Sequence, residues 1–337
     1  MEPTRLPPNQ LHRFYRGGER IARFRSSRND DPYAPEEWIA SMASPFGEPG
    51  VGLSELPDGR SLADAVSRDP EAFLGPAHVA RFGPDVAVLI KLLDAGERLP
   101  VHFHPGDDFA RAHLGSRYGK TEAWVVLEAE PGAAVRLGWL EPVALETLRG
   151  WVEAQDVQAM LEELRHVPVS PGDTLFVPAG TPHAIGEGIL IAELQQPTDF
   201  SVLLEWEGFE IDGPQAGHLG LGFEVAFEAL DRSPWGQEEL AHARSGRSCN
   251  RSGVETMFPA EADGFFRAER IHPAPTQLEA SFSVLLVTRG AAALRGDGWA
   301  LQVELGDAVL VPFAAGACEL SGDAEVLRCR PPDPGAQ

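Results

Sequence analysis

One seven-residue segment occurs twice in the chain and sets the strongest limit on its fold. G-D-T-L-F-V-P at residues 172–178 returns as G-D-A-V-L-V-P at residues 306–312. Each copy places a short apolar stretch between a glycine and a proline, a pattern typical of a buried strand bounded by turns. Because self-similarity indicates a repeated structural unit, the sequence predicts two similar β-domains.

The remaining segments indicate a mainly β chain with a helical insertion. Short apolar stretches such as 86–94 and 122–129 recur between glycine and proline turns, which favours a sandwich or barrel of strands. Apolar residues at helical spacing over about 144–165 predict one or two helices between strands. Residues 61–82 are expected to form two short helices, with Ser61 as N-cap. Short strands are expected around Arg20–Arg25 and Trp38–Ala43.

These patterns divide the chain into three parts. We predict a first, catalytic domain over 1–212, a connecting segment over 213–250 and a second domain over 251–337. The second copy of the repeat is not followed by the histidine that follows the first, so no metal ligands are expected in the second domain.

Composition excludes several classes of function. The 337 residues carry a formal net charge of −23, which argues against nucleic-acid or anionic-membrane partners. No apolar stretch approaches the roughly 20 residues of a membrane span, and the first residues lack an apolar signal core, so we expect a cytoplasmic protein. The cysteines, Cys249, Cys318 and Cys329, show no C-x-x-C spacing, which argues against a disulfide framework and a thiolate metal site.

Basic residues are unevenly distributed. Residues 1–28 carry seven arginines and two glutamates, which we interpret as a solvated or helix-capping arm, with anion binding as the alternative. The chain has only two lysines, Lys91 and Lys120. Both are close in sequence to the histidine motif described next, and lysine offers a compact charge with a tunable pKa.

Four residues are candidates for one metal site. His102 and His104 alternate on one face of a predicted strand, with Phe103 opposite. A neighbouring strand supplies Glu122, and a returning strand supplies His183 after the first copy of the repeat. Three imidazoles and one carboxylate suit Zn²⁺, Fe²⁺, Mn²⁺ or Ni²⁺. Ordinary strand histidines are the alternative.

The two histidine-bearing segments resemble the paired motifs of the cupin superfamily. Within it, the chain resembles the type I mannose-6-phosphate isomerases (phosphomannose isomerases), especially the short bacterial forms, well over roughly 10–210 and loosely beyond. The matching segments are K-L-L-D-A-G-E-R-L-P-V-H-F-H-P-G-D-D, Y-G-K-T-E-A-W, V-P-A-G-T-P-H-A-I-G-E-G and E-L-Q-Q-P-T-D. The resemblance implies two cupin-like (jelly-roll) β-barrel domains.

The resemblance also implies roles for single residues. His104, Glu122 and His183 match metal ligands of the family, whereas His102 stands where the family usually has glutamine. The catalytic residues that it implies are two lysines lining the active site and two acids near the proton-transfer centre: Lys91, Lys120, Glu193 and Asp199. Leu203 replaces an arginine of the family.

The implied activity is a metal-dependent aldose–ketose isomerase. It would interconvert mannose 6-phosphate and fructose 6-phosphate, or a closely related sugar or sugar phosphate, through a cis-enediol. Zn²⁺ is the expected metal, with Mn²⁺, Fe²⁺, Co²⁺ or Ni²⁺ as alternatives, and the protein is expected to be a monomer or homodimer. Arg111 and Arg117 would be phosphate contacts or solvated loop residues. The alternative functions are an iron-dependent cupin dioxygenase and a non-catalytic sugar-binding or regulatory cupin.

Overall fold

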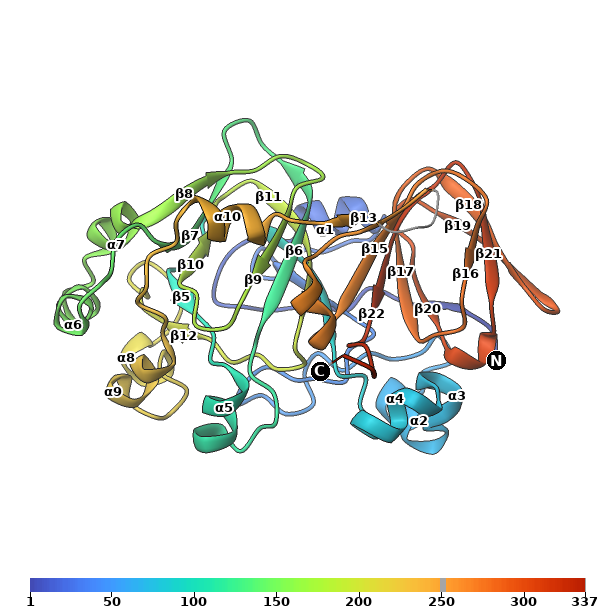
Figure 1. Cartoon of the computed structure of the whole chain (residues 1–337), viewed down its shortest axis with the longest axis horizontal. Coiled ribbons are helices and arrows are strands. Elements are labelled where there is room, and N and C mark those ends of the chain that lie inside the picture. Colours follow the sequence, from blue (N-terminus) through green and yellow to red (C-terminus); the bar gives the residue numbers. More distant parts are fainter. Residues whose placement is uncertain (249–252, 337) are drawn as a thin grey trace.

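The computed structural model describes residues 1–248 and 253–336, whose strands form four antiparallel sheets (Figure 1). The chain is 31% strand and 23% helix, so the predicted mainly β class is confirmed. No closed barrel is found among the described residues, and the two jelly-roll barrels therefore stay a prediction.

The first pair of sheets is built mostly from residues 10–203. A six-stranded sheet has the order β2-β3-β4-β11-β6-β9, and a five-stranded sheet has the order β12-β5-β10-β7-β8. The six strands are β2 (Gln10–Leu11), β3 (Glu36–Ile39), β4 (Leu89–Ala95), β6 (Glu122–Ala129), β9 (Thr174–Val177) and β11 (Ile189–Gln195). The five strands are β5 (His102–Phe103), β7 (Ala134–Trp139), β8 (Leu164–Pro168), β10 (His183–Ile185) and β12 (Val202–Leu203). Their facing surfaces share one buried core that includes Trp124, Leu137 and Ile191.

The second pair of sheets contains the end of the chain. A seven-stranded sheet has the order β1-β20-β17-β22-β15-β14-β13, and a four-stranded sheet has the order β16-β21-β18-β19. The seven strands are β1 (Thr4–Arg5), β13 (Arg247–Ser248), β14 (Val254–Thr256), β15 (Arg267–Ile271), β17 (Ser283–Arg289), β20 (Ala308–Val311) and β22 (Glu325–Arg330). The four strands are β16 (Thr276–Leu278), β18 (Ala291–Gly296), β19 (Trp299–Glu304) and β21 (Cys318–Gly322). Leu285, Leu294 and Val309 belong to the core between them.

A third core joins the two pairs, which lie side by side in Figure 1. Leu92 and Ala192 from the six-stranded sheet share it with Leu286 and Leu310 from the seven-stranded sheet. The six-stranded and the seven-stranded sheet therefore each bury both faces. Because side chains alternate along a strand, one face lies in the sheet's own pair and the other lies between the pairs. Figure 1 also shows the N-terminus beside the second pair, where β1 pairs with β20.

Helices cover the outer parts of the molecule. They are α1 (Glu19–Phe24), α2 (Leu62–Arg68), α3 (Pro70–Leu74), α4 (Pro76–Phe82), α5 (Asp107–Phe109), α6 (Leu145–Ala154), α7 (Val157–Glu163), α8 (Gly213–Ala216), α9 (Phe223–Ala226) and α10 (Gln237–Ala243). Shorter turns of 3-10 helix are η2 (Phe227–Ala229), η3 (Ala260–Gly264) and η4 (Phe313–Ala315), and η1 (Ala110–Leu114) is a π-helix. Among the described residues, none of these helices has the length and apolar character that crossing a membrane would require.

The helical predictions have mixed outcomes. The insertion is confirmed as α6 and α7, which pack on the five-stranded sheet through Leu148 and Met160. Residues 61–82 form three helices rather than two, because Pro70 and Pro76 each begin a new helix. The Ser61 cap is confirmed, since its hydroxyl accepts a hydrogen bond from the Asp64 amide at 3.3 Å.

Two strand predictions near the N-terminus are wrong or too long. Residues 20–25 fall mainly in helix α1, because Ile21 and Phe24 lie one turn apart and are buried together. The strand predicted over Trp38–Ala43 ends at Ile39, and Ala40 follows in a left-handed conformation with a φ of 51°.

The arginine-rich arm is fixed to the sheets by ion pairs. Arg20 lies 2.9 Å from Asp94 and Arg25 lies 2.9 Å from Glu37, and both arginines have mostly buried side chains. The interpretation as a solvated arm is therefore wrong for these residues. Since a buried cation needs a partner, each of them has one in the six-stranded sheet.

Candidate metal centre and pocket

Two neighbouring strands, β5 and β10, bring three of the predicted ligands together. His102 opens β5, His183 opens β10, and these two residues are directly paired across the strands. His104 follows on the same face as His102 because side chains alternate along an extended chain. The three histidines are buried. Each offers one ring nitrogen, and these three nitrogens, from His102, His104 and His183, lie within 4.8 Å of one another.

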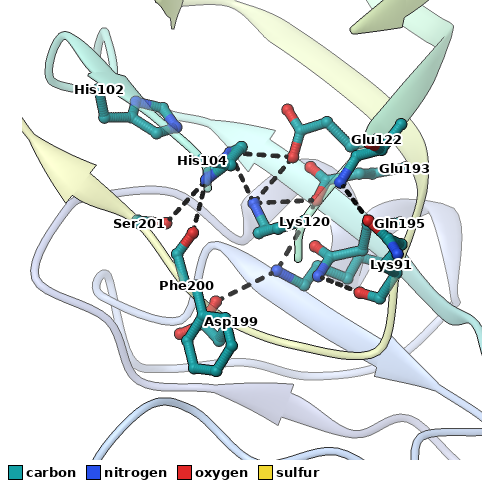
Figure 2. A network of polar contacts seen from close by, with 12 residues as sticks. Lys91, His102, His104, Lys120, Glu122, Glu193, Gln195, Asp199, Phe200 and Ser201 are labelled. Atoms are coloured by element: carbon teal, nitrogen blue, oxygen red, sulfur yellow. Dashed lines mark hydrogen bonds and ion pairs between the residues drawn. The ribbon is translucent and has the colours of Figure 1, made fainter. Parts of the chain in front are cut away.

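Backbone carbonyls fix the orientation of all three imidazoles. The Nδ1 atoms of His102, His104 and His183 donate to the carbonyl oxygens of Pro100 (2.8 Å), Phe200 (2.8 Å) and Thr181 (2.9 Å). A proton on Nδ1 leaves the Nε2 lone pair free, which is the tautomer that a metal requires. Figure 2 shows the contact of His104 with Phe200.

Glu122 completes the donor set from the adjacent sheet. Its carboxylate oxygens lie 3.1 Å from His104 Nε2 and 3.3 Å from His183 Nε2. Burial opposes the charge of this carboxylate, but the positive charge of Lys120 and the contact with His104 hold its pKa well below the ordinary value. Glu122 is therefore a carboxylate at neutral pH.

These four residues fit a divalent metal. Burial lowers the pKa of His102 well below its ordinary value, that of His104 to about 4 and that of His183 to about 3, so all three imidazoles are neutral at pH 7. The Nε2 of His183 is buried without a hydrogen-bond partner. A buried polar atom without a partner is costly, and a metal ion would satisfy it. Three neutral imidazoles and an ionised carboxylate are suitable ligands for Zn²⁺ and similar ions.

Lys120 links the donor set to the rest of the site (Figure 2). Its Nζ lies 2.8 Å from a carboxylate oxygen of Glu122 and 2.8 Å from Nε2 of His104. It also lies 3.9 Å from the carboxylate of Glu193. Lys120 lies two residues before Glu122, and both side chains point into the same interior.

Glu193 occupies the middle of the pocket wall. It lies on β11, directly opposite Lys91 on β4, and its Oε1 is 3.8 Å from Lys91 Nζ. That oxygen has no hydrogen-bond partner among the described residues. Burial and the nearby negative charge of Glu122 raise the pKa of Glu193 to about 7. This carboxyl group can therefore exchange a proton near neutral pH.

Lys91 lies close to three carboxylates. Besides its contact with Glu193, Lys91 Nζ lies 3.3 Å from the carboxylate of Glu36 and 3.6 Å from that of Asp199. The same atom lies over the ring of Trp38. Burial opposes its charge, but the three carboxylates raise the pKa of Lys91 above the ordinary value. The lysine is therefore charged, and it joins Asp199 to the same network as the metal ligands.

Two members of this network were not predicted from the sequence. Glu36, on β3, accepts hydrogen bonds from Tyr15 and Trp38, and Arg13 lies 2.8 Å from Asp199 and 3.3 Å from Glu36. The excess of arginine over residues 1–28 was the available signal. It does not indicate which residue reaches the pocket.

The loop between β5 and β6 is held to the pocket wall by Asp107. Its carboxylate accepts hydrogen bonds from the Gly119 amide (2.8 Å) and from Gln196 Nε2 (2.7 Å). Arg111 bonds Asp108, and Arg117 donates to the Phe82 carbonyl at 3.1 Å. Neither arginine lines the pocket beside the metal ligands, so both belong to an exposed loop.

Leu203 lines the same pocket as the charged residues. It is 3% exposed, lies on β12 and pairs directly with His102 on β5. The pocket is therefore apolar at this position, next to the predicted ligand His102. Arg13, Lys91 and Lys120 are the basic side chains that line the pocket within the described part of the chain.

Known proteins similar to this chain share one description. No family model matches the sequence. The mannose-6-phosphate isomerase ManA of Bacillus subtilis is 27% identical over 252 residues, which are 73% of this chain and 75% of that protein. The mannose-6-phosphate isomerase of Streptococcus mutans is 43% identical over 191 residues, 57% of each chain.

Solved structures show the same fold. The mannose 6-phosphate isomerase from Bacillus subtilis superposes with a TM-score of 0.78 at 21% identity, over 98% of this chain and all of that one. A mannose 6-phosphate isomerase bound with zinc and yttrium superposes with a TM-score of 0.75 at 17% identity, over 99% of this chain and all of that one.

Proposed function

We propose that this chain, which belongs to the mannose-6-phosphate isomerase family, is a metal-dependent isomerase acting on mannose 6-phosphate and fructose 6-phosphate or a closely related sugar phosphate. The observation that carries the proposal is the position of Glu193. A buried carboxyl group whose pKa is raised to about 7 lies beside the four-residue donor set and both lysines of the chain.

His102, His104, Glu122 and His183 would hold the metal, with Zn²⁺ as the first choice and Mn²⁺, Fe²⁺, Co²⁺ or Ni²⁺ as alternatives. When bound, such an ion supplies a Lewis acid that stabilises negative charge on the substrate oxygens. The backbone carbonyls that hold the imidazoles support this assignment, because they keep the nitrogens in the ligand form.

Glu193 would move the proton. Isomerisation of an aldose to a ketose transfers one proton between adjacent carbons through a cis-enediol. As a carboxylate, Glu193 would take the proton from the first carbon, and as the acid it would return the proton to the second. Its free Oε1 and its pKa near 7 support both halves of that cycle.

The remaining polar residues would orient the substrate and balance the charge of the pocket. Lys120, between Glu122 and Glu193, can donate to a substrate oxygen next to the metal ligands. Lys91 holds Glu193 and Asp199 in place, and Asp199 can accept from a sugar hydroxyl at the pocket wall. A purely structural ion-pair network is the alternative for these residues.

The charge of the pocket favours an anionic substrate. Four carboxylates, Glu36, Glu122, Glu193 and Asp199, face three basic side chains, Arg13, Lys91 and Lys120. A divalent cation would turn the net charge of this cluster from minus one to plus one, and a protonated Glu193 would raise it to plus two. Because an uncompensated buried charge is costly, a phosphate group on the sugar would be favoured.

The repeat also supports the finer architecture that we infer. Each pair of sheets would be one cupin-like domain, over 1–212 and 251–337, with 213–250 as the connection; β1 and β13 lie outside the second range and complete its seven-stranded sheet. The equivalent places of β9 and β20, each between a Gly-Asp turn and a proline, support this division. We further expect a monomer or homodimer.

Metal analysis combined with a coupled assay tests the function. We expect about one divalent ion per chain, conversion of mannose 6-phosphate to fructose 6-phosphate, loss of turnover with a chelator and recovery with Zn²⁺, Mn²⁺ or Co²⁺. No turnover at any metal loading would refute the activity for this substrate. Sugar binding without turnover would instead favour a non-catalytic sugar-binding protein, the alternative that the apolar Leu203 beside His102 supports.

A further inference from the structure

We propose that Arg13 binds the anionic group of the substrate and makes the protein selective for a phosphorylated over an unphosphorylated sugar. This inference rests on the proposed isomerase function and assigns the recognition of the phosphate to one residue of the N-terminal arm. Arg13 lies between β2 and α1, far in sequence from the strands that supply the metal ligands.

The arm delivers the Arg13 side chain into the metal-ligand pocket. Its backbone amide donates to the Tyr33 carbonyl at 2.6 Å, which fixes the chain just outside the six-stranded sheet. From there the side chain lines the same pocket as His102, Lys120 and Leu203. Because Leu203 brings no charge, Arg13 is the guanidinium of this pocket among the described residues.

Several N–H donors of the Arg13 guanidinium form no hydrogen bond. Nη2 donates to Asp199 at 2.8 Å, and Nε lies 3.3 Å from Glu36 without forming a hydrogen bond. No other hydrogen bond from Nη1 or Nε of Arg13 is found in the described part of the chain. A guanidinium carries five N–H donors in a planar fork. Nε is buried beside Glu36, so the two donors of Nη1 and the second donor of Nη2 are the ones that can bind oxygens of a phosphate. Asp199 and Glu36 would hold that fork in a fixed orientation.

The two lysines are less suited to this task. The side chains of Lys91 and Lys120 are 2% and 5% exposed, whereas that of Arg13 is 12% exposed. Lys91 contacts three carboxylates, and Lys120 contacts Glu122 and His104. Both lysines are therefore occupied by the groups proposed for proton transfer and metal binding. Arg13 is the basic residue most accessible to a ligand.

The experiment compares Arg13→Gln and Arg13→Lys with the native protein on mannose 6-phosphate and on mannose. Charge-assisted hydrogen bonds are worth about 1.5–3 kcal/mol, so Arg13→Gln should raise KM for mannose 6-phosphate by roughly 10- to 100-fold. Its kcat should change much less, and its kcat/KM for mannose should fall far less than its kcat/KM for mannose 6-phosphate. Arg13→Lys should recover part of the loss, because it keeps the charge but not the fork.

Arg16→Ala is the matched control. Arg16 belongs to the same arm, but its side chain is exposed, bonds Tyr33 and does not line the pocket. It should leave KM and kcat as in the native protein. Metal content and melting temperature of every variant would show that the fold and the donor set are intact. If Arg13→Gln does not fold, Arg13→Lys carries the comparison.

Inorganic phosphate gives a readout that does not depend on turnover. Calorimetric titration should show phosphate binding to the native protein and to Arg16→Ala, weakened about 10-fold or more in Arg13→Gln. An unchanged KM for mannose 6-phosphate, or an equal loss for both sugars with phosphate binding retained, would overturn the role of Arg13. If the native protein turns over neither sugar, the isomerase proposal fails, and phosphate titration alone decides whether Arg13 is an anion site.

Discussion

The two pairs of sheets contain the same short sequence repeat, but one interior is polar and the other is aliphatic. In each, a strand between a Gly-Asp turn and a proline is followed by a further strand on the facing sheet. The first of these following strands, β10, begins with His183, and the second, β21, begins with Cys318. The interior beside His183 contains histidines, lysines and carboxylates, whereas Cys318 belongs to an aliphatic core with Leu294 and Val309.

This difference shows that side chains rather than backbone place the chemistry. Charges buried in the first pair cost desolvation and contribute little net stability. The core inside the second pair and the core between the pairs consist of apolar residues and carry no such cost, although Arg328 and Glu269 form a buried ion pair on the seven-stranded sheet. We infer that the second pair mainly stabilises the fold, whereas the first pair carries the reaction. Five predictions test this division.

The largest effect is expected from His183→Ala. Loss of one of four ligands should weaken metal binding by about 100-fold or more and reduce kcat/KM by at least about 1,000-fold. Metal analysis and the isomerase assay measure both. Cys318→Ala is the matched control at the start of β21, and it should keep the metal and the activity. Equal losses in the two variants would show that the two interiors are not functionally distinct.

Glu193→Gln should abolish proton transfer while keeping the metal. General acid–base catalysis contributes about 100- to 10,000-fold, so kcat should fall by that factor. In the native protein, kcat/KM should rise with pH through about 7, because the carboxylate must be ionised to take the first proton. The remaining activity of the variant should lack this rise. An unchanged profile in the variant would assign the titration to another group.

The same substitution should change how stability depends on pH. Burial raises the pKa of Glu193 to about 7, so the folded state holds a proton that the unfolded state releases at lower pH. This contribution is present at pH values below the ordinary carboxyl pKa and is lost as the pH rises through 7, by about 3 kcal/mol. Denaturant titration at pH 5 and pH 8 should therefore show a smaller decline for Glu193→Gln than for the native protein.

Leu294→Ala tests the second interior. Leu294 on β18 is fully buried in the aliphatic core, so truncation should reduce the free energy of unfolding by about 2–5 kcal/mol. The kcat and KM of the folded protein should stay within a factor of two. A large change in kcat at full metal loading would contradict the division of labour between the two pairs.

Much of the site could be predicted because it depends on local spacing. Alternation along an extended chain placed His102 on the same face as His104, and helical spacing predicted α6 and α7. Arg13 and Glu36 could not be assigned, since their contacts with Asp199 and Lys91 depend on which distant segments pack together. The short helix α1 was missed for a related reason: tertiary burial of Ile21 and Phe24 outweighs the weak preference of so few residues.

The smallest effect is expected at Ser61, which lies outside both interiors. It caps α2, whose Leu62 and Val66 pack in the core that joins the two pairs. Ser61→Ala should reduce the free energy of unfolding by about 1 kcal/mol without changing kcat, because only one helical amide loses its partner. Ser67→Ala, at an exposed position within the same helix, is the matched control and should be neutral or slightly stabilising. If Ser61→Ala altered KM as well, the layer between the pairs would have to be coupled to the pocket, and the two pairs could not be treated as independent.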